Sequence, residues 1–140
     1  AVALSSVLKN IYAVALGIAD GLGWGWNGKG WLSAKGLQEM SSIISRLHRD
    51  VAVVRGTAGA GDFLATSLSP GSFNRETGRQ IALTGECKTS SEGCRAIESV
   101  LRLLGDFEVD LPILYALDHI INKQDDPSAV FQNLFATSES

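Results

Sequence analysis

The stretch LSSVLKNIYAVALGIADGLG, residues 4 to 23, decides the fold class of this chain. Its apolar residues recur at spacings of three and four over roughly four turns, which is the period of an α-helix and too long for an ordinary strand. Those residues are Val7, Leu8, Ile11, Tyr12, Val14, Ala15 and Ile18. Ser5 or Ser6 is a candidate N-cap, and the glycines from Gly21 onward end the helix, as glycines commonly do.

The glycine-rich segment GWGWNG, residues 23 to 28, fits the GxGxxG pattern of a dinucleotide-binding turn. That pattern binds pyrophosphate only where a strand leads into the first glycine and a helix begins at the last. Here a helix precedes the segment, and tryptophans at positions 24, 26 and 31 crowd a place where pyrophosphate needs close backbone access. We therefore interpret the segment as a glycine-rich connection between two packed helices, with no cofactor site in it.

The composition fits one globular domain and argues against several classes of function. The chain has 140 residues, of which 45% are hydrophobic, and a net charge of −3. Because general nucleic-acid surfaces are basic, this charge and a pI near 5.3 argue against a nucleic-acid partner. The sequence has no run of about 18 apolar residues to span a membrane, and its first residues lack the basic start of a signal peptide.

The two cysteines, Cys87 and Cys94, do not have the CxxC spacing of redox and zinc motifs. Their small number favours a reduced pair in the cytoplasm over a structural disulfide. The chain starts with Ala1, and its only methionine is Met40. We therefore expect either a processed protein or a piece of a longer one, cut from a domain that preceded it.

Helical signals continue beyond the first helix. Residues 31 to 50 place an apolar stripe on one face, made of Leu37, Met40, Ile43, Ile44 and Leu47. Asp62 is predicted to cap the start of a short helix that ends at Pro70 and Gly71. Another helix is expected from about Ser72 to Leu83.

Three more helix starts follow in the second half of the chain. The sequence TSSE at 89–92 has the spacing of a capping box. Asp110 with Pro112 opens the next helix, and Asp126 with Pro127 opens the last. Since no alternating strand pattern or internal repeat interrupts these segments, the sequence predicts a single all-α domain over residues 1–140, with roughly six to eight helices.

Lys9 and Asn10 are polar residues beside the apolar stripe of the first helix. A lysine in such a place usually extends along apolar surface to solvent. The alternative is a partly buried lysine that acts as a proton donor, with its pKa adjusted by desolvation and by a neighbouring carboxylate. The pattern alone leaves both interpretations open.

The segment AGAGDFLAT at 58–66 is a second candidate for a site. Its small residues allow the backbone to pack closely against a neighbouring group. Asp62 and Thr66 are one helical turn apart and so share a face. A capped helix after a glycine turn is the plain structural alternative.

The segment SFNRETGR at 72–79 is the third candidate. Arg75 and Arg79 are one helical turn apart, so both are able to reach a single anion near a helix start. The alternative is a solvated face on which Glu76 balances their charge. His48 and His119 have no metal-ligand partner at useful spacing, and we interpret both as structural.

Taken in order, short motifs from about Val2 to Leu134 resemble the C-terminal domain of NAD(P)-dependent glycerol-3-phosphate dehydrogenase. The ordered set carries the resemblance, since no single motif is decisive. The motifs are LKN at 8–10, GIADGLG at 17–23, NGK at 27–29, KGLQEM at 35–40, AGAGD at 58–62 with Thr66, SFNR at 72–75, SSEG at 90–93 and LPI at 111–113.

The resemblance implies an enzyme that reduces dihydroxyacetone phosphate to sn-glycerol 3-phosphate with NAD or NADP. Its cofactor would be bound mainly by an N-terminal Rossmann domain that is absent from this chain. Residues 1–140 would be the C-terminal substrate-binding and catalytic domain of this cytoplasmic enzyme, with a homodimer as a further possibility.

The resemblance also implies roles for individual residues. Lys9 would be the catalytic lysine, which protonates or polarises the ketone oxygen, and Asp62 would keep it charged. Asn10, Asp62 and Thr66 would orient the lysine and the substrate hydroxyls. An Arg-Asn-Arg run binds the substrate phosphate in the family, and this run corresponds here to Phe73 followed by Asn74 and Arg75. A cation at the ketone agrees with the chemistry, because hydride addition places negative charge on that oxygen.

Two residues depart from the family pattern. Phe73 replaces the first arginine of the usual serine-arginine-asparagine-arginine, and Lys35 replaces another arginine. Phe73 leaves a second class of function open, namely a divergent helical module that binds a ligand or dimerises without catalysis. The four retained polar residues Lys9, Asn10, Asp62 and Thr66 favour the dehydrogenase, because a non-catalytic module need not keep them.

Overall fold

The computed structural model describes residues 2–47, 73–85, 91–105 and 110–139. These residues form helices and no strand, so the predicted all-α class is confirmed for the described part of the chain. The short helix expected from Asp62 lies outside these residues. The helices are α1 (Val2–Gly21), α2 (Trp26–Leu47), α5 (Phe73–Thr84), α6 (Glu92–Leu104), α7 (Pro112–Ile121) and α8 (Pro127–Glu139).

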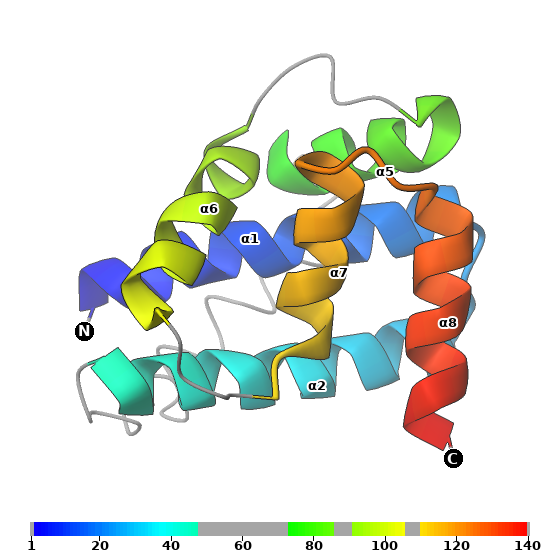
Figure 1. Cartoon of the computed structure of the whole chain (residues 1–140). Helices are drawn as coiled ribbons and strands as arrows, with labels where there is room; N and C mark the ends of the chain where they lie inside the picture. The colour runs from blue at the N-terminus through cyan, green and yellow to red at the C-terminus, as the bar shows by residue number, and fades with distance from the viewer. Residues whose placement is uncertain (1, 48–72, 86–90, 106–109, 140) are drawn as a thin grey trace.

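Helix α1 is the centre of the domain (Figure 1). Every residue from Ile11 to Ala19 is buried. A helix that is apolar on all sides needs partners on all sides, and α1 has α2 antiparallel to it, α5 on the opposite side, and α6 and α7 packed across it. Helix α1 already begins at Val2, so the expectation that Ser5 or Ser6 caps it is wrong, and both serines lie within the helix.

Two glycines bring α1 and α5 into backbone contact. A Cβ atom at Gly17 would overlap the carbonyl oxygen of Arg75, and one at Gly78 would overlap the carbonyl oxygen of Val14. Only glycine permits this approach, because any other residue carries a Cβ atom. The contact fixes the start of α5 against the middle of α1.

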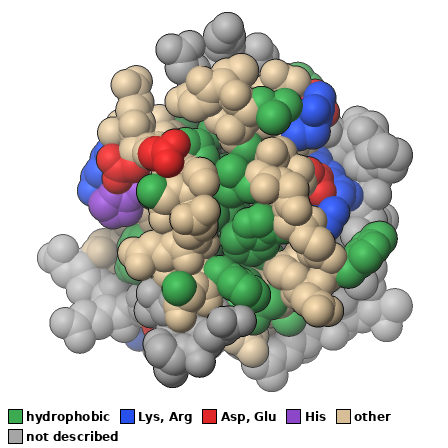
Figure 2. Space-filling view, turned by 90° about the vertical axis from the view of Figure 1, so that its right-hand side faces the viewer, with side chains coloured by type: hydrophobic (Ala, Val, Ile, Leu, Met, Phe, Trp, Pro, Cys, Tyr) green, Lys and Arg blue, Asp and Glu red, His purple; other side chains and the backbone are tan. Residues whose placement is uncertain are grey.

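The connection between α1 and α2 is the tight turn predicted for the glycine-rich segment, although it is shorter than expected because α2 already begins at Trp26. Gly23 takes a φ of 80°, a conformation that favours glycine. The ring of Trp24 lies 5.5 Å from that of Phe131 and 5.3 Å from that of Phe135, so the turn packs against α8. Figure 2 shows the end of the molecule where α8 lies, with apolar side chains gathered at its centre.

The helix starts of α6 and α8 have local caps. The Ser91 hydroxyl accepts a hydrogen bond from the Cys94 N–H at 3.2 Å, so the cap of α6 is Ser91 and not the Thr89 that the capping-box spacing suggested. The predicted Asp126 cap is confirmed, because its carboxylate accepts from the Ala129 N–H at 3.1 Å.

Helix α7 is capped by a distant residue. The helix begins at Pro112, as the Asp110 and Pro112 signal predicted, and its N-cap position is Leu111, which makes no side-chain capping hydrogen bond. The buried Glu39 of α2 accepts instead from the Ile113 N–H at 2.8 Å and the Leu114 N–H at 3.1 Å. These are two of the orphan donors at the helix start, and one carboxylate satisfies both.

Glu39 also joins α1 to this junction, because the Tyr12 hydroxyl donates to it at 2.9 Å. Burial raises the pKa of Glu39 to about 7, against the opposing effect of the hydrogen bonds from Ile113, Leu114 and Tyr12. Burial also raises the pKa of Tyr12 well above 10.0, and the Glu39 charge adds to that shift. The Tyr12–Glu39 pair therefore connects three helices through a buried ionisable group.

Candidate active site

Lys9 and Asn10 lie in the N-terminal half of α1, at the edge of the core. Both are partly exposed, whereas their neighbours Leu8 and Ile11 are fully buried. Because α1 carries these two residues one after the other, they point to adjacent sectors of the helix surface. This places a cation and an amide together at the boundary between apolar core and solvent.

The first turn of α6 meets Asn10 and Asn74. The Asn10 Nδ2 donates to the Glu92 carboxylate at 3.4 Å, and the Gly93 backbone N–H donates to the Asn74 Oδ1 at 3.0 Å. Asn74 belongs to the first turn of α5, so one helix start holds side chains from two other helices. The structure thus brings together two of the predicted substrate-binding residues, Asn10 and Asn74.

Gly93 makes this convergence possible. A Cβ atom at this position would lie 2.5 Å from the Asn10 carbonyl oxygen and 3.0 Å from the Asn74 Oδ1. The first of these contacts is with backbone, which cannot rotate away as a flexible side chain can. A glycine is therefore required where α6 approaches α1.

Arg75 is directed toward the other half of α1. Its guanidinium forms two hydrogen bonds with the Asp20 carboxylate, at 2.5 and 3.0 Å, and the Lys29 ammonium contacts the same carboxylate at 3.0 Å. Burial raises the pKa of Asp20, but the hydrogen bonds from Arg75 and Lys29 outweigh it and hold the pKa below its ordinary value. Asp20 lies ten residues beyond Asn10 on α1, roughly 15 Å along the helix at 1.5 Å per residue.

Arg79 has a separate partner. It forms hydrogen bonds of 2.7 and 2.9 Å with Glu76 on the exposed face of α5. The hydrogen bonds from Arg79 and then Gln80 lower the pKa of Glu76 to about 2. The structure therefore shows Arg75 and Arg79 bound to two different carboxylates rather than turned toward one anion site.

Several predicted residues lie outside the described part of the chain, namely Asp62, Thr66 and His48. His119 is described, and its Nδ1 lies 3.0 Å from the Asp125 carboxylate on an exposed surface. Among the described residues no group of three or more histidines, cysteines or carboxylates is arranged to hold a metal ion. No described helix has the length and apolar character needed to cross a membrane.

Comparison with known proteins assigns the family. Residues 1–132 match the model of the NAD-dependent glycerol-3-phosphate dehydrogenase C-terminus. The chain belongs to this family. The expected resemblance is therefore confirmed across almost the whole sequence.

Individual relatives of this glycerol-3-phosphate dehydrogenase domain support the same family assignment. A glycerol-3-phosphate dehydrogenase [NAD(P)+] of Streptomyces coelicolor is 35% identical over 142 residues, which is 96% of this chain and 42% of the relative. The Neisseria meningitidis enzyme of the same name is 31% identical, over 98% of this chain and 44% of its own length. The crystal structure of glycerol-3-phosphate dehydrogenase from Coxiella burnetii superimposes with a TM-score of 0.88 at 29% identity, over 96% of this chain and 43% of that one. The chain thus spans less than half the length of the relatives it matches.

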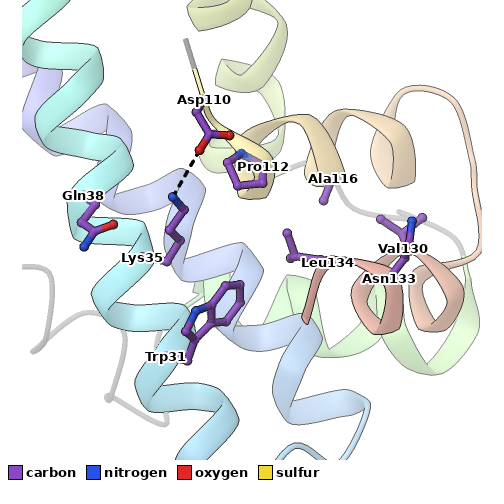
Figure 3. Close-up of a pocket in the computed structure, with 9 residues that line it drawn as sticks. All are labelled: Trp31, Lys35, Gln38, Asp110, Pro112, Ala116, Val130, Asn133 and Leu134. Carbon is purple, nitrogen blue, oxygen red and sulfur yellow. Dashed lines mark ion pairs between the residues drawn. The ribbon is translucent and has the colours of Figure 1, made fainter. Parts of the chain in front are cut away.

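The dehydrogenase domain also has a cavity of about 530 Å³ between α2, α7 and α8 (Figure 3). Lys35 lies there with its ammonium 3.7 Å from the Asp110 carboxylate. None of the predicted site residues lines this cavity. The cavity is therefore separate from the group formed by Asn10, Asn74 and the first turn of α6.

Three residues that contact Asn10, Asn74 or Arg75 were not predicted as site residues from the sequence. Glu92 and Gly93 belong to the SSEG motif, which contributed to the resemblance without receiving a role, and Asp20 belongs to GIADGLG in the same way. The available signal was the position of SSEG at a helix start, where backbone N–H groups have no partner within the helix. The spacing of residues along the sequence does not predict which distant side chains contact these N–H groups.

Proposed function

We propose that this chain is the substrate-binding and catalytic half of a glycerol-3-phosphate dehydrogenase that interconverts dihydroxyacetone phosphate and sn-glycerol 3-phosphate. The observation that carries the proposal is the convergence of Asn10 and Asn74 on the first turn of α6, next to Lys9, in a chain that matches the family over residues 1–132. The cytoplasm is the proposed location, because two cysteines in 140 residues favour reduced thiols over a structural disulfide.

The cofactor is proposed to be held mainly by an N-terminal dinucleotide-binding domain. The turn at Gly23 follows a helix, so the described residues do not supply the strand–turn–helix unit that binds pyrophosphate. Lys9 and Asn10 are partly exposed, which leaves them accessible from a second domain. When bound, NAD(P)H supplies the hydride that adds to the ketone carbon.

Lys9 is proposed to donate the proton that this addition requires. As the carbonyl carbon accepts a hydride, its oxygen gains negative charge and takes a proton from the Lys9 ammonium, which solvent later restores. Asp62 and Thr66 are proposed to orient the lysine and the substrate hydroxyls. Asn10 and Asn74 are proposed to bind the substrate, with Asn74 at its phosphate, and Arg75 is proposed to contribute positive charge nearby.

The test is the oxidation of NADH or NADPH by the full-length protein with dihydroxyacetone phosphate, followed by absorbance. Lys9→Ala should lower kcat by about 10²- to 10⁴-fold, the range for loss of a general acid. Lys123→Ala is the matched control, because Lys123 is exposed and makes only a 4.0 Å contact with Asp118. Wild-type turnover in Lys9→Ala would contradict the proposed role.

A second candidate function is a non-catalytic ligand-binding or dimerisation module. The observation in its favour is Phe73, which is 58% exposed at the start of α5 where the family has an arginine. A full-length wild-type protein with no turnover of dihydroxyacetone phosphate with either cofactor would favour this candidate.

A further inference from the structure

The first turn of α6 contacts Asn10 and Asn74 through groups of opposite hydrogen-bonding type. Gly93 offers a backbone N–H, which only donates, and Glu92 offers a carboxylate, which only accepts when ionised. An asparagine amide has one end that accepts and one that donates, and the two look alike in shape. The partner of each amide therefore determines which end remains for a ligand.

For Asn74 the determining partner is Gly93. Because the Gly93 N–H needs an acceptor, the Oδ1 of Asn74 accepts from it at 3.0 Å, so the Nδ2 is the end of this amide that is left to donate to another partner. For Asn10 the determining partner is Glu92, whose carboxylate accepts from the Nδ2 at 3.4 Å, so the Oδ1 is the end of this amide that is left to accept from another partner. The two asparagines are thus oriented in opposite senses by adjacent residues of one turn.

We propose that Glu92 and Gly93 are positioning residues, which set the amides so that Asn74 presents an N–H donor and Asn10 presents an oxygen acceptor to the substrate. This inference rests on the proposed function, in which both asparagines contact a phosphorylated hydroxyketone. A donor suits the phosphate oxygens, and an acceptor suits a substrate hydroxyl. The orientation is fixed before the substrate arrives, so substrate binding does not have to order these amides.

Glycine at position 93 is part of the same arrangement. A Cβ atom there would press on the Asn10 carbonyl at 2.5 Å and on the Asn74 Oδ1 at 3.0 Å, and so would move the N–H away from its acceptor. Gly93→Ala should therefore impair substrate binding and folding together. Gly30→Ala is the matched control, since Gly30 also lies in a helix and a Cβ atom added there would meet no other part of the domain within 4 Å.

The decisive variant is Asn74→Asp, which separates orientation from folding. The aspartate still accepts from the Gly93 N–H, and a negative side chain at the start of α5 is favourable. It has no donor for the phosphate, however, and repels it. We expect the Tm of the full-length protein to stay within about 3 °C of wild type, while KM for dihydroxyacetone phosphate rises at least about tenfold.

Asn74→Leu completes the thermal comparison. Leucine leaves the Gly93 N–H without an acceptor, so its Tm should fall by about 4 °C or more below that of Asn74→Asp. Equal Tm values for the two variants would overturn the orientation by Gly93. An unchanged KM in Asn74→Asp would overturn the donor role of Asn74.

The role of Glu92 is tested by two variants, one of which is conservative. Glu92→Ala frees the Asn10 amide to rotate and should lower kcat/KM by about 3- to 10-fold, as expected for one weak, exposed hydrogen bond. Glu92→Gln retains an oxygen that accepts from Asn10 and should restore most of that loss. Equal losses in both variants, or no loss in either, would overturn the role of Glu92.

The comparison of Tm values between Asn74→Asp and Asn74→Leu does not depend on enzymatic activity. A wild-type protein inactive toward dihydroxyacetone phosphate would contradict the proposed function and, with it, the part of this inference that names the substrate. The orientation of Asn74 by Gly93 would still be decided by the Tm values of Asn74→Asp and Asn74→Leu.

Discussion

Glu39 should make the stability of this domain fall as the pH rises from about 5 to 8. Its carboxyl is 1% exposed and has a pKa of about 7, against an ordinary value of 4.5. The folded state therefore binds this proton more tightly than the unfolded state does. The stability that the proton contributes is fully present below pH 4.5 and is lost as the pH rises to about 7.

The magnitude follows from the two pKa values. At 1.36 kcal/mol per unit, the shift from 4.5 to about 7 amounts to about 3 kcal/mol. Between pH 5 and pH 8 the free energy of unfolding should then fall by roughly 2.5 kcal/mol through this group alone. Urea denaturation of the chain across this pH range measures the change.

Glu39→Gln isolates the contribution of this group, because an amide stays neutral at every pH. At pH 5 the protonated carboxyl keeps two oxygens with lone pairs toward the Ile113 and Leu114 N–H groups, whereas the amide has one acceptor oxygen and turns an NH2 donor toward the other N–H, so the variant should be about 1–3 kcal/mol less stable than wild type at this pH. At pH 8 the difference should largely vanish or reverse. Glu98→Gln is the control, because the Glu98 side chain is 71% exposed and its pair with Arg102 is long, at 3.4 Å. Parallel pH curves for wild type and Glu39→Gln would refute the reasoning.

Two further outcomes are expected. The 140-residue chain alone should not bind NADH or turn over substrate, because its glycine-rich turn follows a helix; micromolar binding in a calorimetric titration would contradict this. Gly17→Ala should destabilise the chain by roughly 1–3 kcal/mol in urea, since its methyl group would overlap the Arg75 carbonyl oxygen, whereas Gly30→Ala should be neutral or stabilising; equal effects would show that α1 and α5 separate without cost.

The helices were predictable because their signals are local. The period of the apolar residues in α1, the Asp126–Pro127 start of α8 and the extent of α5 are each read within a few residues. The errors occurred where a local signal competes with a distant partner. Pro112 marks the start of α7 locally, but no signal near that start points to Glu39, 74 positions from Ile113, whose carboxylate accepts from the N–H groups there. A glutamate within the apolar stripe of α2 was the available signal, since a buried carboxylate needs donors.

At the candidate site, too, the distant partners were not predicted from local signals. Arg75 and Arg79 share a helix face, which suggested one anion, but Asp20, 55 positions from Arg75, lies within reach once α1 and α5 pack through Gly17 and Gly78. Helical spacing reports neighbours on one helix and is silent about the helix opposite. The helical pattern singled out Lys9 and Asn10 as candidates, the family resemblance supplied their roles, and those roles stay predictions.

Phe73 gives the sharpest test of substrate affinity. A well-placed arginine–phosphate interaction contributes roughly 1.5–3 kcal/mol, or about 10- to 150-fold in affinity, and phenylalanine supplies no donor. Compensation by Arg75 would require it to leave its two hydrogen bonds with Asp20, and Arg79 would have to leave Glu76. We therefore expect uncompensated loss, so that Phe73→Arg in the full-length protein lowers KM for dihydroxyacetone phosphate at least about tenfold. Leu83→Arg adds the same charge at 57% exposure on the far end of α5 and should leave KM unchanged. An unchanged or raised KM in Phe73→Arg, together with a damaging Arg75→Ala, would show that Arg75 already binds the phosphate.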